Sequence, residues 1–218
     1  IIPLLREAYP RIRFVTHAEV TEKRITEQAY ATYSIGLFFD DKANIHQPTD
    51  FRLVGLHRTA GYILGVDPTE APAAVAIEDP GRPIDEPYVC IATQATGQSK
   101  YWNNPDGWTE IVRYLKELGY RVICIDQQPA VGQGLVWNRM PAGAEDETGD
   151  RPLPERARWL KHADCFIGLS SGLSWLAWAA GTLVVMISGF TPPINEFATP
   201  SRVINYHVCN SCWNDPLP

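Results

Sequence analysis

Short apolar runs alternate with amphipathic stretches in the second half of the chain. Four of these runs predict buried strands, at residues 88–92, 122–125, 165–168 and 183–187. Three stretches between them have the apolar spacing of helices, at residues 108–118, 154–162 and 172–180. Strands that alternate with helices predict a parallel sheet with right-handed crossovers and helices on both faces. Gly119 can end the first of these helices in the left-handed conformation.

The first 66 residues predict a smaller α/β unit. Strands are expected near residues 13–16 and 33–39, and a polar helix at residues 21–28. Apolar positions from Phe51 to Leu64 then recur at roughly helical spacing behind Asp50, which can cap the helix.

Prolines and acidic side chains dominate residues 67–87, and such a composition is typical of an interdomain linker. We therefore predict a partial N-terminal α/β domain at residues 1–66 and a linker at residues 67–87. A Rossmann-like domain follows at residues 88–205, where the strands and helices alternate.

The composition indicates a folded chain that is not built for nucleic acid. The 218 residues are 45% hydrophobic and 20% charged, which excludes a disordered tail. The 19 Lys and Arg against 25 Asp and Glu give a net charge of -6, with no basic run. Polynucleotide binding is disfavoured because it depends on neutralising phosphates, whereas local donors can still hold a small anionic ligand.

The ends of the sequence and its apolar runs indicate where in the cell the protein is expected. No run approaches the roughly 20 residues of a membrane span, and residues 1–5 are too short for a signal sequence. We expect a cytoplasmic protein. Because the chain starts at Ile1 and stops just after a cysteine pair, we also expect it to be part of a longer protein.

Three loops follow predicted strands, at residues 93–101, 126–134 and 169–172. Because the carboxyl ends of parallel strands lie at one edge of the sheet, these loops are expected to converge on a ligand site. Residues 168–174 cross from a strand into a helix, whose free amides can hold a diphosphate, and Gly172 allows close approach. An equally good interpretation of Ser170 or Ser171 is a plain helix N-cap.

Two charged residues in these loops are candidates for ligand contacts. Lys100 lies where its ammonium can reach a phosphate across the loop, although a solvated surface lysine is the usual alternative. Asp126 ends the second strand, where a carboxylate can accept hydrogen bonds from ribose hydroxyls. An ordinary turn carboxylate explains Asp126 about as well.

The turn before the last helix also permits a hydrolase interpretation. Residues 168–172 match G-x-S-x-G, and Glu196 and His207 follow Ser170 in the order of an α/β-hydrolase triad. The small number of strands upstream of Ser170 argues against this alternative.

Cys209 and Cys212 have the C-x-x-C spacing of a metal knuckle for zinc or iron. The remaining ligands of such a site would lie beyond Pro218, unless His207 supplies one. A redox pair or two free thiols are the alternatives, and the other cysteines lie in apolar strand runs.

Several segments together resemble the bacterial autotransporter heptosyltransferases, which are related to the lipopolysaccharide heptosyltransferases. The resemblance lies in the following stretches: residues 33–40, 47–52, 55–62, 99–102 and 168–178, with the pair Cys209 and Cys212. It implies a GT-B fold of two Rossmann-like domains across a cleft, with the acceptor-side N-terminal domain incomplete here. It also implies transfer of heptose from ADP-heptose to serine hydroxyls of an autotransporter adhesin in the cytoplasm.

The same resemblance implies roles for particular residues. Lys100 matches a phosphate-contacting lysine, Thr96 a nearby hydroxyl, and Ser170, Ser171, Gly172 and Leu173 the loop that receives the diphosphate. Ser170 and Trp175 replace an aspartate and a histidine of the lipopolysaccharide branch, and these changes fit the autotransporter branch better. The autotransporter branch also has a four-cysteine iron site and forms large rings, which implies a homo-oligomer and a metal segment starting at residues 206–218.

The mechanism expected from these features is an inverting transfer in which Lys100 stabilises charge on the diphosphate. The base is expected before Ile1, and neither Asp40 nor Asp41 is assigned to this role. The alternative to an enzyme is a non-catalytic α/β binding or assembly module with a metal knuckle.

Overall fold

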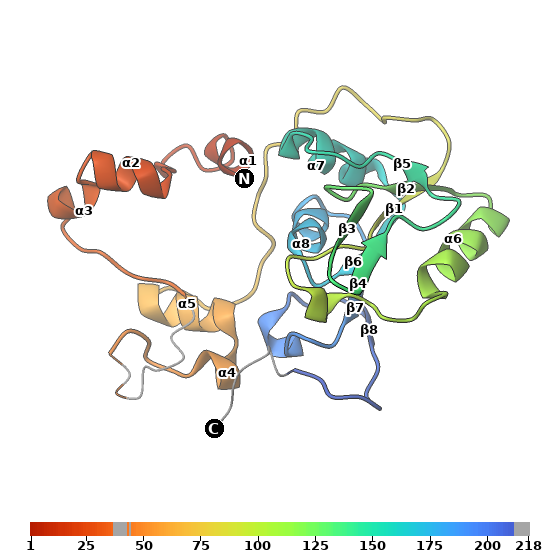
Figure 1. Ribbon diagram of the computed structural model, residues 1–218. Helices are drawn as coiled ribbons and strands as arrows, with labels where there is room; N and C mark the ends of the chain where they lie inside the picture. Colours follow the sequence, from red (N-terminus) through yellow and green to blue (C-terminus); the bar gives the residue numbers. More distant parts are fainter. Residues whose placement is uncertain (37–42, 44, 212–218) are drawn as a thin grey trace.

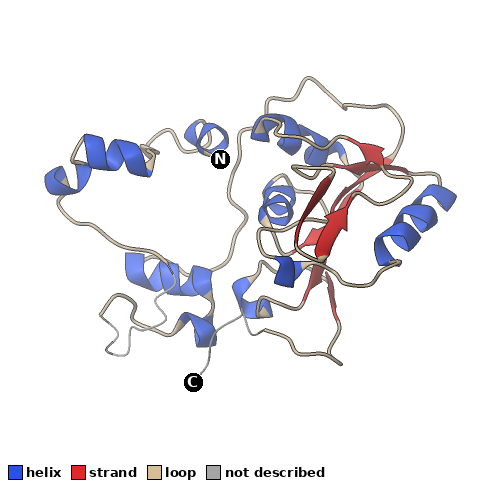
Figure 2. Ribbon diagram, in the orientation of Figure 1, coloured by secondary structure: helices blue, strands red, loops and turns tan. Residues whose placement is uncertain are grey.

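The second half of the chain folds around one parallel sheet. The computed structural model describes residues 1–36, 43 and 45–211. Its six-stranded sheet has the order β5-β2-β1-β6-β7-β8, and neighbouring strands pair in parallel throughout. In chain order the strands are β1 (Tyr88–Ala92), β2 (Arg121–Cys124), β5 (Glu145–Asp146), β6 (Cys165–Leu169), β7 (Val184–Ser188) and β8 (Ser201–Ile204). Figure 2 shows this sheet with helices around it.

Helices cover both faces of the sheet, as the sequence predicts. Figure 1 shows α7 (Leu153–His162) and α8 (Gly172–Ala179) on one face and α6 (Gly107–Glu117) on the other. Strand β1 is buried along its whole length and supplies both cores by alternation. Tyr88 and Cys90 join the α7 and α8 cluster, whereas Val89 and Ile91 join the α6 cluster.

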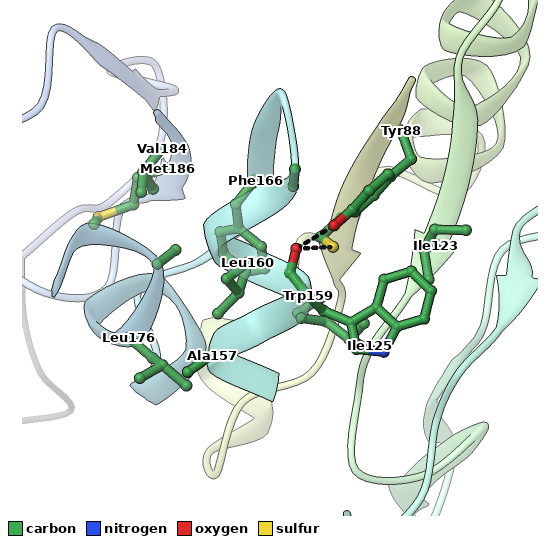
Figure 3. Close-up of a cluster of buried hydrophobic side chains, with 14 of the residues drawn as sticks. Tyr88, Ile123, Ile125, Ala157, Trp159, Leu160, Phe166, Leu176, Val184 and Met186 are labelled. Atoms are coloured by element: carbon green, nitrogen blue, oxygen red, sulfur yellow. Dashed lines mark hydrogen bonds between the residues drawn. The ribbon is translucent and has the colours of Figure 1, made fainter. Parts of the chain in front are cut away.

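The first of these clusters is the larger core (Figure 3). Trp159 packs its ring edge-on against Tyr88, with ring centroids 5.4 Å apart. The Tyr88 hydroxyl donates a 2.8 Å hydrogen bond to the Trp159 carbonyl, so this buried polar group has a partner. Burial also raises the pKa of Tyr88, which keeps its hydroxyl protonated. The contact fixes α7 on the first strand of the sheet.

The predicted elements of this domain are confirmed to within about one residue. Strand β1 has the predicted bounds, and α8 begins at the predicted Gly172. Gly119 has a φ of 91° just after α6, and the Tyr120 amide donates to the Leu115 carbonyl. This left-handed glycine ends α6 as predicted and turns the chain into β2.

Four strands were not predicted. The stretch between the strand predicted at residues 122–125 and the helix predicted at residues 154–162 contains the antiparallel hairpin of β3 (Ala130–Gln133) and β4 (Val136–Arg139), and also β5. The fourth is the edge strand β8. These strands are short and mostly outside the cores, so they lack the continuous apolar run that marks a buried strand.

The N-terminal part contains helices and loops where the structure describes it. Its helices are α1 (Ile2–Arg6), α2 (His17–Glu22), α3 (Ile25–Gln28), α4 (Phe51–Val54) and α5 (Leu56–Leu64). The strand expected near residues 13–16 is wrong because Thr16 caps α2 in a capping box with Glu19. Residues 33–36 form no strand, and residues 37–39, like Asp40 and Asp41, lie outside the described residues. The predicted α/β unit therefore has no strand in the described part of residues 1–66.

Gly55 divides the predicted helix of residues 51–64 into α4 and α5. Asp50 caps α4 as predicted, since its side chain accepts from the Arg52 amide. Gly55 has a φ of 89°, and a Cβ there would lie 2.3 Å from the Ile194 carbonyl oxygen. The Leu56 amide donates a 2.7 Å hydrogen bond to Asn195 Oδ1 beside it. This close approach requires glycine and joins the N-terminal helices to the β7–β8 connection.

Residues 67–87 have no regular secondary structure, as expected of a linker, but they pack on the sheet domain. Val75, Ile77 and Ile84 lie against the larger core, and the Ala76 amide donates to the Leu4 carbonyl. Leu4 of α1 belongs to that core as well. The segment therefore ties α1 to the sheet domain. In the described part of the chain, no helix is long and apolar enough to cross a membrane.

Asp79 fastens this segment to the end of α7. Its carboxylate lies 2.8 Å from Lys161 Nζ and 2.6 Å from His162 Nε2. The hydrogen bond from Lys161 has the larger effect and that from His162 the next, and together they hold the pKa of Asp79 below its ordinary 3.8. A lowered folded-state pKa means that the ionised group stabilises the fold above the unfolded pKa. This contribution is lost as pH falls through the folded pKa.

We expect Asp79→Asn to lower the Tm of the full-length protein at neutral pH by at most about 3 °C, since exposed ion pairs contribute little. The gap from wild type should narrow as the pH falls below 3.8 and close near the lower pKa of the folded state, because the unfolded wild-type carboxyl takes up its proton first. Thermal unfolding across an acid series measures both. A gap that stays constant through the series would show that the ion pairs are not its source.

Candidate active site

A cavity of about 920 Å³ lies at the carboxyl edge of the sheet. Residues of all three predicted loops line it: Gln94, Ala95, Thr96, Tyr101, Asp126, Gln127, Gln128, Val131, Ser171 and Gly172. The rest of its wall comes from α1, residues 71–75, residues 149–151, α7 and α8. β1 and β6 are neighbours in the sheet with their connections leaving to opposite sides, so the cavity lies at a topological switch point. The predicted convergence of the loops is confirmed.

The start of α8 faces this cavity without a side-chain cap. Ser171 is the N-cap residue, but its side chain makes no capping hydrogen bond. The first amides of a helix have no intrahelical acceptor and carry partial positive charge. A Cβ at Gly172 would meet nothing within 4 Å, so the space beside these amides is open. Leu173 of the first turn also lines the cavity. This turn can receive an anionic group.

Lys100 points to the same turn. It ends the short 3-10 helix η1 (Gln98–Lys100), and its Nζ donates a 3.2 Å hydrogen bond to the Ser170 carbonyl. The ammonium also lies over the Phe190 ring, 5.7 Å from the centroid. Ser170 itself is buried, and neither Ser170 nor Lys100 is part of the cavity wall. The ammonium and the start of α8 are therefore adjacent, as a diphosphate cradle requires.

The Asp126 carboxylate accepts hydrogen bonds from other residues of the protein. Oδ2 accepts from the Thr93 amide at 2.8 Å and the Thr93 hydroxyl at 3.0 Å, and Oδ1 accepts from the Gln94 amide at 3.2 Å. Asp126 is only 1% exposed, and this burial raises the pKa of its carboxyl. The geometry favours a role in holding the loop after β1 and does not favour the predicted contact with ribose.

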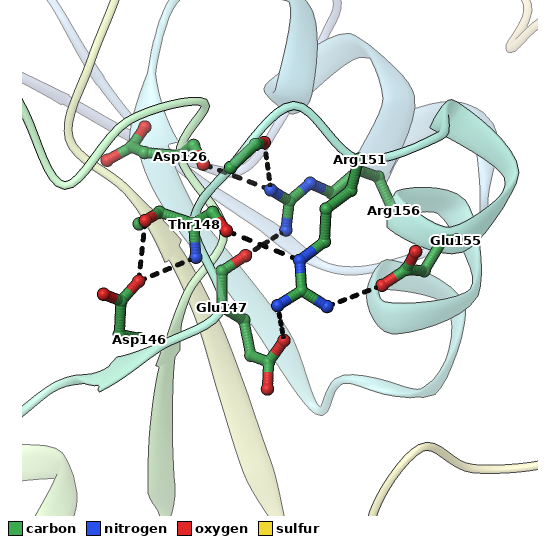
Figure 4. Close-up of polar contacts among 8 residues, drawn as sticks. Asp126, Asp146, Glu147, Thr148, Arg151, Glu155 and Arg156 are labelled. Carbon is green, nitrogen blue, oxygen red and sulfur yellow. Dashed lines mark hydrogen bonds and ion pairs between the residues drawn. The ribbon is translucent and has the colours of Figure 1, made fainter.

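Arg156 of α7 is a wall residue that the sequence did not single out (Figure 4). The side chain is buried, and its Nη2 donates to the carbonyls of Asp126 at 3.1 Å and Gly149 at 2.9 Å. Its Nη1 donates to the Glu147 carbonyl. Desolvation lowers the pKa of Arg156 from its ordinary value. One guanidinium thus joins the loops after β2 and β5 beneath the cavity.

Arg151 lies at the cavity rim beside Arg156. Its guanidinium is 2.7 Å from a carboxylate oxygen of Glu147 and 2.9 Å from one of Glu155. No sequence pattern marks either arginine, because both fall at positions typical of the polar side of a loop or helix.

The hydrolase triad is not assembled, although all three of its residues are described. Glu196 Oε1 accepts a 2.6 Å hydrogen bond from Ser188, and Oε2 lies 3.0 Å from Arg202 Nε. His207 is exposed, and no hydrogen bond joins it to Ser170 or Glu196. The carboxylate needed to orient the histidine is already paired elsewhere.

The predicted metal knuckle is not seen in the part of the chain that the structure describes. Cys209 is an exposed free thiol, and Cys212 lies outside the described residues. Among the residues described, no three His, Cys, Asp or Glu side chains group as metal ligands. These residues do not by themselves fit a metal ion.

The fold and the cavity together define a Rossmann-like domain that can hold a diphosphate-containing ligand. Comparison with known families agrees: the chain belongs to glycosyltransferase family 9 (heptosyltransferase), whose model matches residues 58–215. The predicted family resemblance is confirmed, and the architecture is the GT-B-like fold of heptosyltransferases.

Curated relatives match nearly the whole chain. It is 59% identical to the autotransporter heptosyltransferase BAHTCr of Citrobacter rodentium, covering 99% of this chain and 51% of the relative. The autotransporter heptosyltransferase TibC of Escherichia coli is 58% identical, covering 99% and 52%. The inactive autotransporter heptosyltransferase BimC of Burkholderia thailandensis is 49% identical, covering 99% and 50%. The chain spans about half the length of the curated relatives it matches.

A solved structure is similar over almost the same extent. The crystal structure of dodecameric iron-containing TibC in complex with ADP-D-beta-D-heptose has a TM-score of 0.89 and 57% sequence identity. The match covers 98% of this chain and 55% of the TibC chain.

Proposed function

We propose that this chain is the donor-binding part of a heptosyltransferase that binds ADP-heptose in the cavity at the carboxyl edge of the sheet. The observation that carries the proposal is the position of the Lys100 ammonium beside the uncapped start of α8. A lysine and free helix amides together form a binding site for a diphosphate. The similarity to TibC, which was crystallised with ADP-D-beta-D-heptose, supports heptose as the sugar.

In the proposed reaction, a serine hydroxyl of an autotransporter adhesin attacks the anomeric carbon from the face opposite ADP. The new carbon–oxygen bond forms as the bond to the diphosphate breaks, and ADP leaves with the bonding electrons. Lys100 and the first amides of α8 stabilise the charge that develops on the diphosphate. A base from outside this chain accepts the serine proton.

Within the site we assign different roles to the predicted donor-binding residues. Lys100, Gly172 and Leu173 are proposed to surround the diphosphate, with Ser171 at the helix start and the exposed Thr96 hydroxyl nearby. Asp126 is proposed to hold the loop after β1, because its carboxylate is occupied by Thr93 and Gln94. Ser170 is proposed to act through its carbonyl, which accepts from Lys100.

We further propose that the full-length protein is cytoplasmic, forms a homo-oligomer and contains iron. TibC is dodecameric and iron-containing at 57% identity, which supports the last two properties. Cys209 and Cys212 are proposed as two of the iron ligands, with the others outside this chain.

Donor binding and transfer need separate measurements, because the 49% identical BimC is an inactive relative. We expect calorimetric titration of the full-length protein to show that ADP binds at least about tenfold more tightly than AMP, since a second charged phosphate reaches Lys100. Mass spectrometry of a co-expressed adhesin should then detect heptose on serine.

Failure of ADP to bind would contradict the proposed donor site. Binding of ADP without any heptose on the adhesin would instead favour the non-catalytic module.

A further inference from the structure

The β3–β4 hairpin contacts the donor loop, residues 93–101, near both of its ends. This loop carries Thr96 and Lys100, and the hairpin lies about 30 residues further along the chain, just after β2. Side-chain amides make two of the contacts between hairpin and loop. Asn138 of β4 donates to the loop, and Gln98 of η1 donates to the hairpin. Neither residue is part of the cavity wall.

Asn138 fixes the beginning of the donor loop. Its Nδ2 donates to the Thr93 carbonyl, and its Oδ1 lies 3.0 Å from the Thr93 hydroxyl. That hydroxyl is also within hydrogen-bond distance of Asp126 Oδ2. Thr93 is fully buried, and Asn138 is 9% exposed. The first residue of the loop is therefore held between β4 and the end of β2.

Gln98 fixes the end of the donor loop that carries Lys100. Its Nε2 donates to the Gln133 carbonyl at 3.3 Å and to the Val136 carbonyl at 3.2 Å. These two carbonyls flank the turn of the hairpin. Gln98 and Lys100 share the same short 3-10 helix, so a bond that holds Gln98 also restricts the direction of the lysine side chain.

We propose that the β3–β4 hairpin positions Lys100 for the diphosphate, with Gln98 and Asn138 as the positioning residues. This inference rests on the proposed function, because the diphosphate is the ligand that Lys100 would contact. A three-residue 3-10 helix has weak internal hydrogen bonding, and an unattached loop must be ordered when the ligand binds. By holding the turn before binding, the hairpin reduces that entropic cost.

Gln98→Leu in the full-length protein tests the proposal, because leucine removes the amide and Gln98 is half-buried at the surface of the fold. We expect the Kd for ADP to rise roughly three- to tenfold, the loss of one or two ordinary hydrogen bonds. The Kd for AMP should change less, because only the diphosphate reaches Lys100. The ratio of AMP to ADP affinity, measured by titration calorimetry, therefore separates positioning of Lys100 from a general loss of structure.

Gln28→Leu is the matched control. Gln28 of α3 also donates its side-chain amide to a backbone carbonyl, that of Lys23, and it lies far from the cavity wall. This variant should keep the wild-type preference for ADP. Hydrogen exchange without ligand should become faster at residues 98–101 in Gln98→Leu and stay unchanged in Gln28→Leu.

Two results would overturn the inference and leave the proposed function standing. One is an unchanged ADP preference in Gln98→Leu when wild type binds ADP. The other is an equal loss of ADP and AMP affinity, which indicates a general structural defect. If wild-type protein bound no ADP, the proposed function would fail, and this inference would fail with it.

Discussion

Lys100→Met in the full-length protein is expected to weaken ADP binding by roughly 10- to 100-fold, because a hydrogen bond to a charged group contributes about 1.5–3 kcal/mol. Methionine keeps an apolar stem near the Phe190 ring and removes only the ammonium. We expect transfer to fall further, by about 10²–10³-fold, since charge on the diphosphate increases as ADP leaves. Titration calorimetry and a transfer assay with adhesin measure the two effects.

Lys116→Met is the matched control for Lys100→Met. Lys116 of α6 also donates to a backbone carbonyl, that of Gly143, at 3.2 Å, but these two residues line a separate hollow beside α6. This substitution should leave ADP affinity at the wild-type value. If Lys100→Met bound ADP as tightly as Lys116→Met, the ammonium would have no part in donor binding.

The buried half of the fold could be predicted because its pattern is local. Strand β1 is apolar along its full length and is buried on both faces, so five consecutive residues identify it. The described part of residues 1–66 has no comparable run of buried residues. Thr16 fits an extended segment by propensity, but its hydroxyl and Glu19 form a capping box that starts α2. At Thr16 the side-chain hydrogen bonds of the cap outweigh the strand propensity of the residue.

The position of the site could be predicted, but not the partners within it. Loops after parallel strands must share one edge, so the convergence of residues 93–101 and 169–172 follows from topology. The role of Asp126 depends on Thr93, 33 positions earlier, and the sequence shows no link between them. Gln98 and Asn138 were missed for the same reason, since a hairpin that lies mostly outside the cores has no strong pattern.

Arg156→Leu is expected to destabilise the full-length protein by about 2–4 kcal/mol, because three backbone carbonyls lose a charged donor. Relief of the desolvation that lowers the pKa of Arg156 offsets part of the loss. The corresponding fall in Tm is about 5–15 °C for the domain that contains α7. Urea and thermal unfolding measure these changes.

Two further variants separate the bonds of Arg156 from its charge. Arg156→Lys keeps the charge but cannot span three carbonyls with one ammonium, so we expect an intermediate loss of stability. Arg158, two residues along α7, donates to the carbonyls of Gly81 and Arg82 but is only half-buried, and Arg158→Leu should therefore cost less. Equal losses in Arg156→Leu and Arg158→Leu would contradict a special role for Arg156. A loss confined to Arg156→Leu would show that the three carbonyl bonds of its buried guanidinium stabilise the domain.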